Sequence, residues 1–134
     1  ISMRLVPGQN WKRINDLFTK HILNISPDTV SVKVTEHHGG QPYVAPTDTI
    51  GFEAASKAYE DVFNKKPIAT RDGGSIPIIA LFEQELNSKT ILMGFGLDSD
   101  AIHSPNEHYG VSNFLQGIET ISKFYYHFTN LSKD

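Results

Sequence analysis

Two short stretches of the chain carry residues whose types and spacing suit ligand chemistry. The first is Arg-Asp-Gly-Gly-Ser-Ile-Pro at residues 71–77. Ser75 is a good N-cap for a following helix, and Gly74 lets a ligand approach the backbone closely. Because the N-terminus of a helix carries unpaired N–H groups and a positive dipole end, this turn is a candidate anion site.

The second stretch is the loop that contains His103, which follows an apolar run at residues 90–95. A loop at the end of a strand, beside a helix N-terminus, is where open α/β sheets place their ligand sites. A neutral imidazole there is a candidate metal ligand. Each of the two stretches also has a purely structural explanation. Gly-Gly-Ser is common where a strand turns into a helix, and a single histidine in a loop is usually a surface residue.

Composition narrows the class of protein. The chain has 134 residues, is 39% hydrophobic and 20% charged, and has a net charge of −3, which predicts one globular domain with a substantial core. The acidic balance, without a basic face, disfavours nucleic acid as a partner. There are no cysteines, which excludes thiolate zinc sites and is compatible with a cytoplasmic location. No apolar run approaches the roughly 20 residues that a membrane span needs.

Hydrophobic periodicity predicts an α/β fold. Alternation and apolar runs predict strands over residues 1–6, 29–36, 68–70 and 90–95. Helical spacing predicts helices over residues 10–25, 47–64 and 75–86, and a terminal helix capped by Ser112. The last helix carries an expected buried stripe made of Phe114, Ile118, Ile121, Tyr125 and Phe128.

A hinge is expected where glycine and proline concentrate, within residues 36–46. The chain also opens directly in a strand-like alternation, Ile-Ser-Met-Arg-Leu-Val, without an initiator methionine. We therefore expect it to be a piece of a longer protein.

Four stretches, in this order, resemble the C-terminal portion of a zinc metallopeptidase family that includes carnosinases, bacterial dipeptidases, glutamate carboxypeptidase, aminoacylase and succinyl-diaminopimelate desuccinylase. The resemblance is greatest to the carnosinase-like dipeptidases. The stretches are Ser-Met-Arg-Leu-Val-Pro (2–7), His-Gly-Gly-Gln-Pro (38–42), Arg-Asp-Gly-Gly-Ser-Ile-Pro (71–77) and His-Ser-Pro-Asn-Glu (103–107).

The resemblance implies the C-terminal part of an α/β/α-sandwich peptidase domain, together with a strand–helix–strand piece of a lid domain that makes a homodimer. Residues 1–38 would belong to the lid, 39–46 to the hinge and 47–134 to the catalytic domain. The implied activity is hydrolysis of dipeptides or N-acyl amino acids by water that a two-zinc site activates.

The resemblance also implies roles for single residues. His103 matches a zinc ligand of the family, and Arg4 matches a lid arginine that reaches the substrate's terminal carboxylate. Ser75, with the backbone of Gly74, matches the turn that holds the same end of the substrate. The family's other metal ligands and its general base are absent from this sequence, so we expect the fragment itself to be inactive and close to metal-free. The alternative is a non-catalytic anion-binding or dimerisation module.

Overall fold

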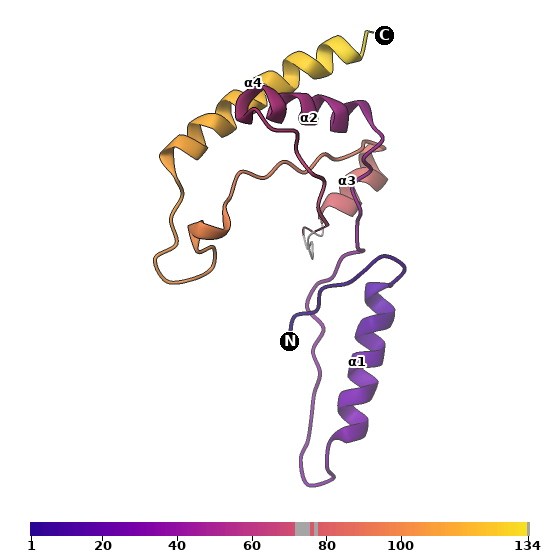
Figure 1. The fold of residues 1–134 in the computed structure, drawn as a ribbon. Coiled ribbons are helices and arrows are strands. Elements are labelled where there is room, and N and C mark those ends of the chain that lie inside the picture. Colours follow the sequence, from indigo (N-terminus) through magenta and orange to yellow (C-terminus); the bar gives the residue numbers. More distant parts are fainter. Residues whose placement is uncertain (72–75, 77, 134) are drawn as a thin grey trace. The chain divides into compact units, whose positions relative to one another are not determined.

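The computed structural model describes residues 1–71, 76 and 78–133. Its elements, in order, are helices α1 (Trp11–Ile25), α2 (Ile50–Phe63) and α3 (Ile78–Leu86), the short 3₁₀ helix η1 (Asp98–Asp100) and helix α4 (Val111–Leu131) (Figure 1). The chain forms two compact units, one made of residues 1–44 and 71–90, the other of residues 45–70 and 91–134. The predicted division into lid, hinge and catalytic domain stays a prediction.

Helix α1 begins and ends close to the predicted bounds. The Asn10 side chain accepts a hydrogen bond from the backbone N–H of Arg13 at 3.1 Å, which satisfies one of the free donors of the first turn. At the other end, the Ser26 hydroxyl donates to the carbonyl of Ile22 at 2.7 Å. No residue of this helix is fully buried.

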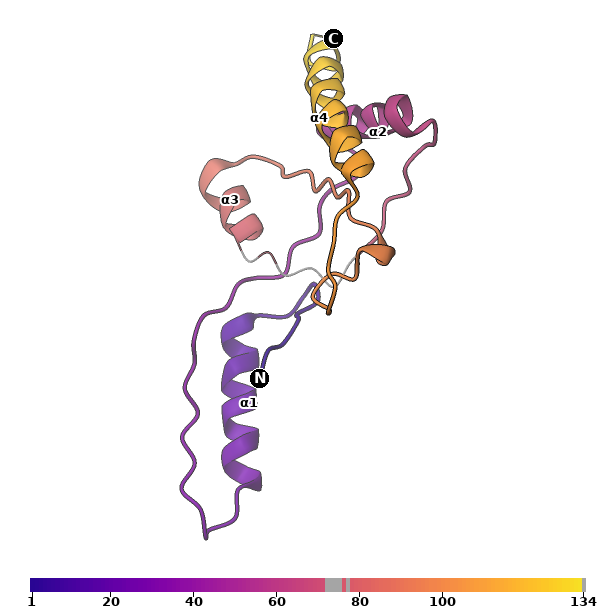
Figure 2. The ribbon, with the colours of Figure 1, turned by 90° about the vertical axis from the view of Figure 1, so that its left-hand side faces the viewer.

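The segment after α1 runs back along that helix, as both ribbon views show (Figures 1 and 2). Gly39 lies so close to the indole of Trp11 that a Cβ at this position would be 2.4 Å from the ring atom Cε3. Gly39 therefore allows close backbone packing against Trp11. The hinge that the sequence suggested over this segment stays a prediction.

Helices α2 and α4 pack against each other in the second unit. Thr49 caps α2 by accepting from the N–H of Phe52 at 3.2 Å, and Asn64 ends it with a φ of 52°. The side chains that the pair buries completely are small, namely Ala54, Ala58 and Thr120. The Thr120 hydroxyl donates to the Gln116 carbonyl of its own helix at 2.7 Å, so it brings no unpaired donor into the interface.

The predictions for α4 were wrong in two respects. The helix has its N-cap at Gly110 and begins at Val111, so Ser112 lies inside the first turn. The expected buried stripe is exposed, and its members range from 40% exposed at Ile121 to 64% at Tyr125. The buried positions are Asn113, Gly117 and Thr120, which lie one residue before that stripe and on an adjacent face of the helix.

The strands predicted at residues 1–6, 29–36, 68–70 and 90–95 are not confirmed. Within the described ranges these segments are neither helix nor strand. A strand exists by exchanging backbone hydrogen bonds with a neighbour, and no bond found there joins two of these segments.

The expected substantial core is also missing from the part of the chain that the structure describes. There, the buried hydrophobic residues are Ala54, Ala55, Ala58 and Ile79. Much large apolar surface is therefore left without a partner. None of the described helices has the length and unbroken apolar character that crossing a membrane demands.

Candidate functional site

The predicted site residues fall in different parts of the chain. Gly74 and Ser75 lie outside the described residues. Arg4 is exposed in the first unit and His103 is exposed in the second. The surroundings of His103 form a loop with defined backbone hydrogen bonds.

His103 occupies the third position of a tight turn. The N–H of Ser104 donates to the carbonyl of Ala101 at 2.9 Å, which closes the turn around Ile102 and His103. The φ of His103 is 62°, as the third position of a type II turn requires. Residues other than glycine rarely adopt this conformation, and such residues concentrate at functional sites.

A second turn follows directly. The N–H of Glu107 donates to the Ser104 carbonyl at 3.2 Å, with Pro105 and Asn106 between them. Proline at the second position and an asparagine with a φ of 64° at the third are the residues that a type II turn favours. Two successive turns thus give the loop a defined path and leave the His103 side chain at the surface.

Asp100 closes the base of this loop. It is 4% exposed, and its Oδ2 accepts from the N–H of Leu97 at 2.8 Å. Its backbone carbonyl accepts from the N–H of His108 at 3.0 Å. One residue therefore ties the entry of the loop to its exit.

Helices α2 and α4 both hold the segment that leads into the loop. The Tyr59 hydroxyl donates to the Gly94 carbonyl at 2.7 Å, and the Asn113 amide donates to the carbonyl of Phe95. Burial raises the pKa of the Tyr59 phenol above its ordinary value of 10.0. The phenol therefore stays protonated, and able to donate this hydrogen bond, to a higher pH than an ordinary tyrosine.

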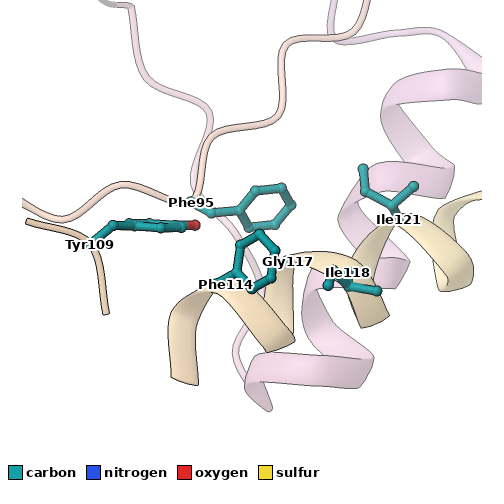
Figure 3. Close-up of a pocket in the computed structure, with 6 residues that line it drawn as sticks. All are labelled: Phe95, Tyr109, Phe114, Gly117, Ile118 and Ile121. Carbon is teal, nitrogen blue, oxygen red and sulfur yellow. The ribbon is translucent and has the colours of Figure 1, made fainter. Parts of the chain in front are cut away.

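The ring of Phe95 completes this attachment. It stacks on Tyr59 with a centroid distance of 5.4 Å and lies over Gly117, where an added Cβ would be 3.3 Å from the ring. Phe95 also lines a shallow apolar depression of about 200 Å³ with Tyr109, Phe114, Gly117, Ile118 and Ile121 (Figure 3). The Tyr109 ring meets Phe114 edge to face at 6.4 Å.

The metal site that the sequence suggested around His103 needs more ligands than this one side chain. An exposed imidazole such as that of His103 can bind zinc, but stable zinc sites need three or four ligands. Across residues 1–71, 76 and 78–133, no group of three or more histidine, cysteine, aspartate or glutamate side chains is arranged to hold a metal ion. Those residues therefore do not form a complete metal site by themselves.

Sequence reasoning missed the residues that shape the loop. Asp100 belongs to an acidic run that reads as solvated surface, and Tyr59 and Asn113 look like ordinary helix residues. The hydrogen bonds from Tyr59 to Gly94 and from Asn113 to Phe95 join residues that are 35 and 18 positions apart, and no local sequence pattern reveals such pairs.

Comparison with known proteins gives the family. Residues 4–127 match the family described as Peptidase family M20/M25/M40. The chain belongs to this peptidase family. The resemblance expected from the four sequence stretches, including the one at residues 103–107, is thereby confirmed.

Relatives within the M20/M25/M40 family are dipeptidases by name. The chain is 38% identical over 133 residues to the Cys-Gly metallodipeptidase DUG1 of Candida albicans, covering 95% of this chain and 27% of that protein. It is 30% identical over 129 residues to the human Beta-Ala-His dipeptidase, covering 92% of this chain and 25% of that protein. The solved structure of the dipeptidase Dug1p from Saccharomyces cerevisiae matches with a TM-score of 0.76 and 28% identity, over 93% of this chain and 27% of that one.

Proposed function

We propose that this chain is the C-terminal part of a metal-dependent peptidase or amidohydrolase that hydrolyses dipeptides or N-acyl amino acids. The observation that carries the proposal is the family match over residues 4–127. The names of the relatives, a Cys-Gly metallodipeptidase and a Beta-Ala-His dipeptidase, indicate dipeptides as the substrates to test first.

The large apolar residues left exposed on α4 support the view that the chain is part of a larger domain. Phe114 is 54% and Ile118 is 52% exposed, and adjacent apolar positions on one helix face normally pack against a neighbouring element. The chain spans 25–27% of the length of these relatives, which leaves ample sequence to supply that element.

In this proposal the segments at 1–6, 29–36, 68–70 and 90–95 become strands when the neighbouring strands of the full-length protein pair with them. The result is the C-terminal part of an α/β/α sandwich, from residue 47 onward, and a strand–helix–strand piece of the lid over residues 1–38. The lid would form a homodimer, and the location of the protein would be cytoplasmic.

The proposal gives roles to four residues. His103 would be one ligand of a zinc site whose other ligands would lie elsewhere in the full-length protein; a metal held there would supply activated water for hydrolysis of the amide. The guanidinium of Arg4 would bind the substrate carboxylate with two parallel hydrogen bonds. Gly74 and Ser75 would hold the same carboxylate through backbone and hydroxyl donors.

The test compares the 134-residue chain with the full-length protein that contains it. We expect the full-length protein to hydrolyse Cys-Gly or β-Ala-His and to contain stoichiometric zinc, and the chain by itself to do neither. In the full-length protein, His103→Ala should lower metal content and activity together. His108→Ala is the matched control, because it removes an exposed imidazole five residues away on the same loop.

Two outcomes would overturn the proposal. One is a full-length protein that binds no metal and hydrolyses no dipeptide, which would favour a non-catalytic anion-binding or dimerisation module. The other is unchanged metal content and activity in His103→Ala.

A further inference from the structure

We propose that Asp100 is a positioning residue that sets the conformation in which the loop presents His103. This inference rests on the proposed function, in which His103 is a metal ligand. It concerns a different residue, one that touches neither the metal nor the substrate and acts through the backbone of the loop.

The carboxylate of Asp100 is buried and committed to one partner. At 4% exposure it has lost nearly all its water, and its Oδ2 accepts from the N–H of Leu97 at 2.8 Å. A buried carboxylate is costly unless it accepts hydrogen bonds, so the bond from the Leu97 N–H couples the burial of Asp100 to the conformation of the loop. A Cβ at Gly96 would lie 3.9 Å from the same oxygen and 3.2 Å from Ile102 Cδ1, so glycine leaves room for the arrangement.

The loop that Asp100 closes is conformationally demanding. Between the two hydrogen-bonded ends, Ala101, His103 and Asn106 all have positive φ, with values of 53°, 62° and 64°. Each of these residues prefers negative φ in a free chain. Their shared conformation is therefore maintained by the turn hydrogen bonds and by the closure at the base of the loop.

Loss of the closure would redirect the imidazole. If the Leu97 N–H loses its acceptor, the 3₁₀ turn that aligns the Asp100 carbonyl with His108 is free to relax, and His103 can return to negative φ. Changing φ from positive to negative moves the Cβ and the ring relative to the backbone. Misplacing a ligand or its support typically lowers metal affinity by about 10- to 100-fold.

Asp98 supplies the matched control. It lies in the same 3₁₀ turn and carries the same charge, but its side chain is exposed. Any effect that arises only from removing a negative charge near His103 should appear in Asp98→Ala as well as in Asp100→Ala.

The experiment uses the full-length protein and two measurements, zinc affinity and amide hydrogen exchange of the metal-free protein. Asp100→Ala should bind zinc about 10- to 100-fold more weakly, and residues 97–108 should exchange faster while other segments stay unchanged. Asp100→Asn should recover most of the affinity, because the amide oxygen can accept the same hydrogen bond. Asp98→Ala should stay within about twofold of the wild type.

The outcomes separate this inference from the proposed function. If wild-type protein binds zinc and hydrolyses dipeptides but Asp100→Ala behaves like the wild type, the positioning role is wrong and the function stands. If Asp100→Asn loses as much affinity as Asp100→Ala, the charge matters and the positioning role is again wrong. Should Asp100→Ala fail to fold, Asp100→Glu replaces it: this variant keeps the charge but displaces the acceptor, so wild-type affinity would refute the proposal. A wild type without zinc or activity overturns both.

Discussion

Gly117→Ala sets two opposing effects of known size against each other. In a helix interior, alanine is more favourable than glycine by about 1 kcal/mol. The new Cβ, however, would lie 3.3 Å from Cγ and Cδ2 of Phe95, which is closer than the 3.5–4.0 Å at which carbon atoms attract best. The sign of the net effect depends on whether the Phe95 ring can move away by a few tenths of an ångström.

Several contacts hold Phe95 in place. Its carbonyl accepts from the Asn113 amide, and its ring stacks on Tyr59 at 5.4 Å with an interplanar angle of 25°. Overpacking against a fixed neighbour costs about 1–3 kcal/mol, which exceeds or equals the gain in helix propensity. We therefore expect Gly117→Ala to lower the free energy of unfolding by about 0–2 kcal/mol.

Gly117→Ala should instead raise the free energy of unfolding when the Phe95 ring is removed. In a Phe95→Ala background the atoms that crowd the new Cβ are absent, so Gly117→Ala should stabilise by about 1 kcal/mol. The assay is urea denaturation of the wild type, both single variants and the double variant, followed by far-ultraviolet circular dichroism. The expected coupling energy between the two positions is about 1–3 kcal/mol, and a value below about 0.5 kcal/mol would refute the reasoning.

Three further perturbations test other contacts. Tyr59→Phe removes the hydrogen bond to the Gly94 carbonyl and should cost about 1 kcal/mol. Burial raises the pKa of Tyr59 in the folded protein, so the stability that its hydroxyl contributes should be complete below about pH 10. That stability should be lost as the pH rises through the raised pKa. In alkaline denaturation, Tyr59→Phe should not lose this part of the stability. Gly39→Ala should destabilise by about 1–3 kcal/mol, because its Cβ would be 2.4 Å from the Trp11 ring; an unchanged denaturation midpoint would contradict this contact. Arg4→Ala in the full-length protein should raise the KM for dipeptides by about 10- to 100-fold, and unchanged kinetics would count against its carboxylate role.

Helix bounds were the most predictable part of the fold, because they depend on local chemistry. Asn10 and Thr49 cap α1 and α2 through hydrogen bonds to N–H groups three residues away, and a sequence pattern shows such pairs directly. The start of α4 was missed because Gly110 supplies the N-cap position without any side-chain hydrogen bond.

Strands and buried faces were less predictable, because they depend on partners distant in sequence. The alternation at residues 29–36 marks a chain suited to pairing, but it cannot tell whether a neighbouring strand is present. The periodicity of α4 correctly identifies an apolar stripe through Ile118. It could not reveal that α4 instead buries Gly117 and Thr120, the first beneath Phe95.

The site was predictable only as isolated residues. His103 stands out because of its type and its place after an apolar segment. The positive φ at His103 and the closure by Asp100 emerge only when the loop is built, because both depend on hydrogen bonds among its backbone groups.

Trp11, which packs closely against Gly39, is an internal fluorescent reporter of the first unit. Trp11 is the single tryptophan of the sequence and belongs to the first unit, whereas α2 and α4 belong to the second. Indole emission would therefore follow the environment of the first unit, while tyrosine absorbance would follow mainly the second, which holds four of the five tyrosines (Tyr59, Tyr109, Tyr125 and Tyr126). One sample can thus show whether the two units lose their structure together or one after the other.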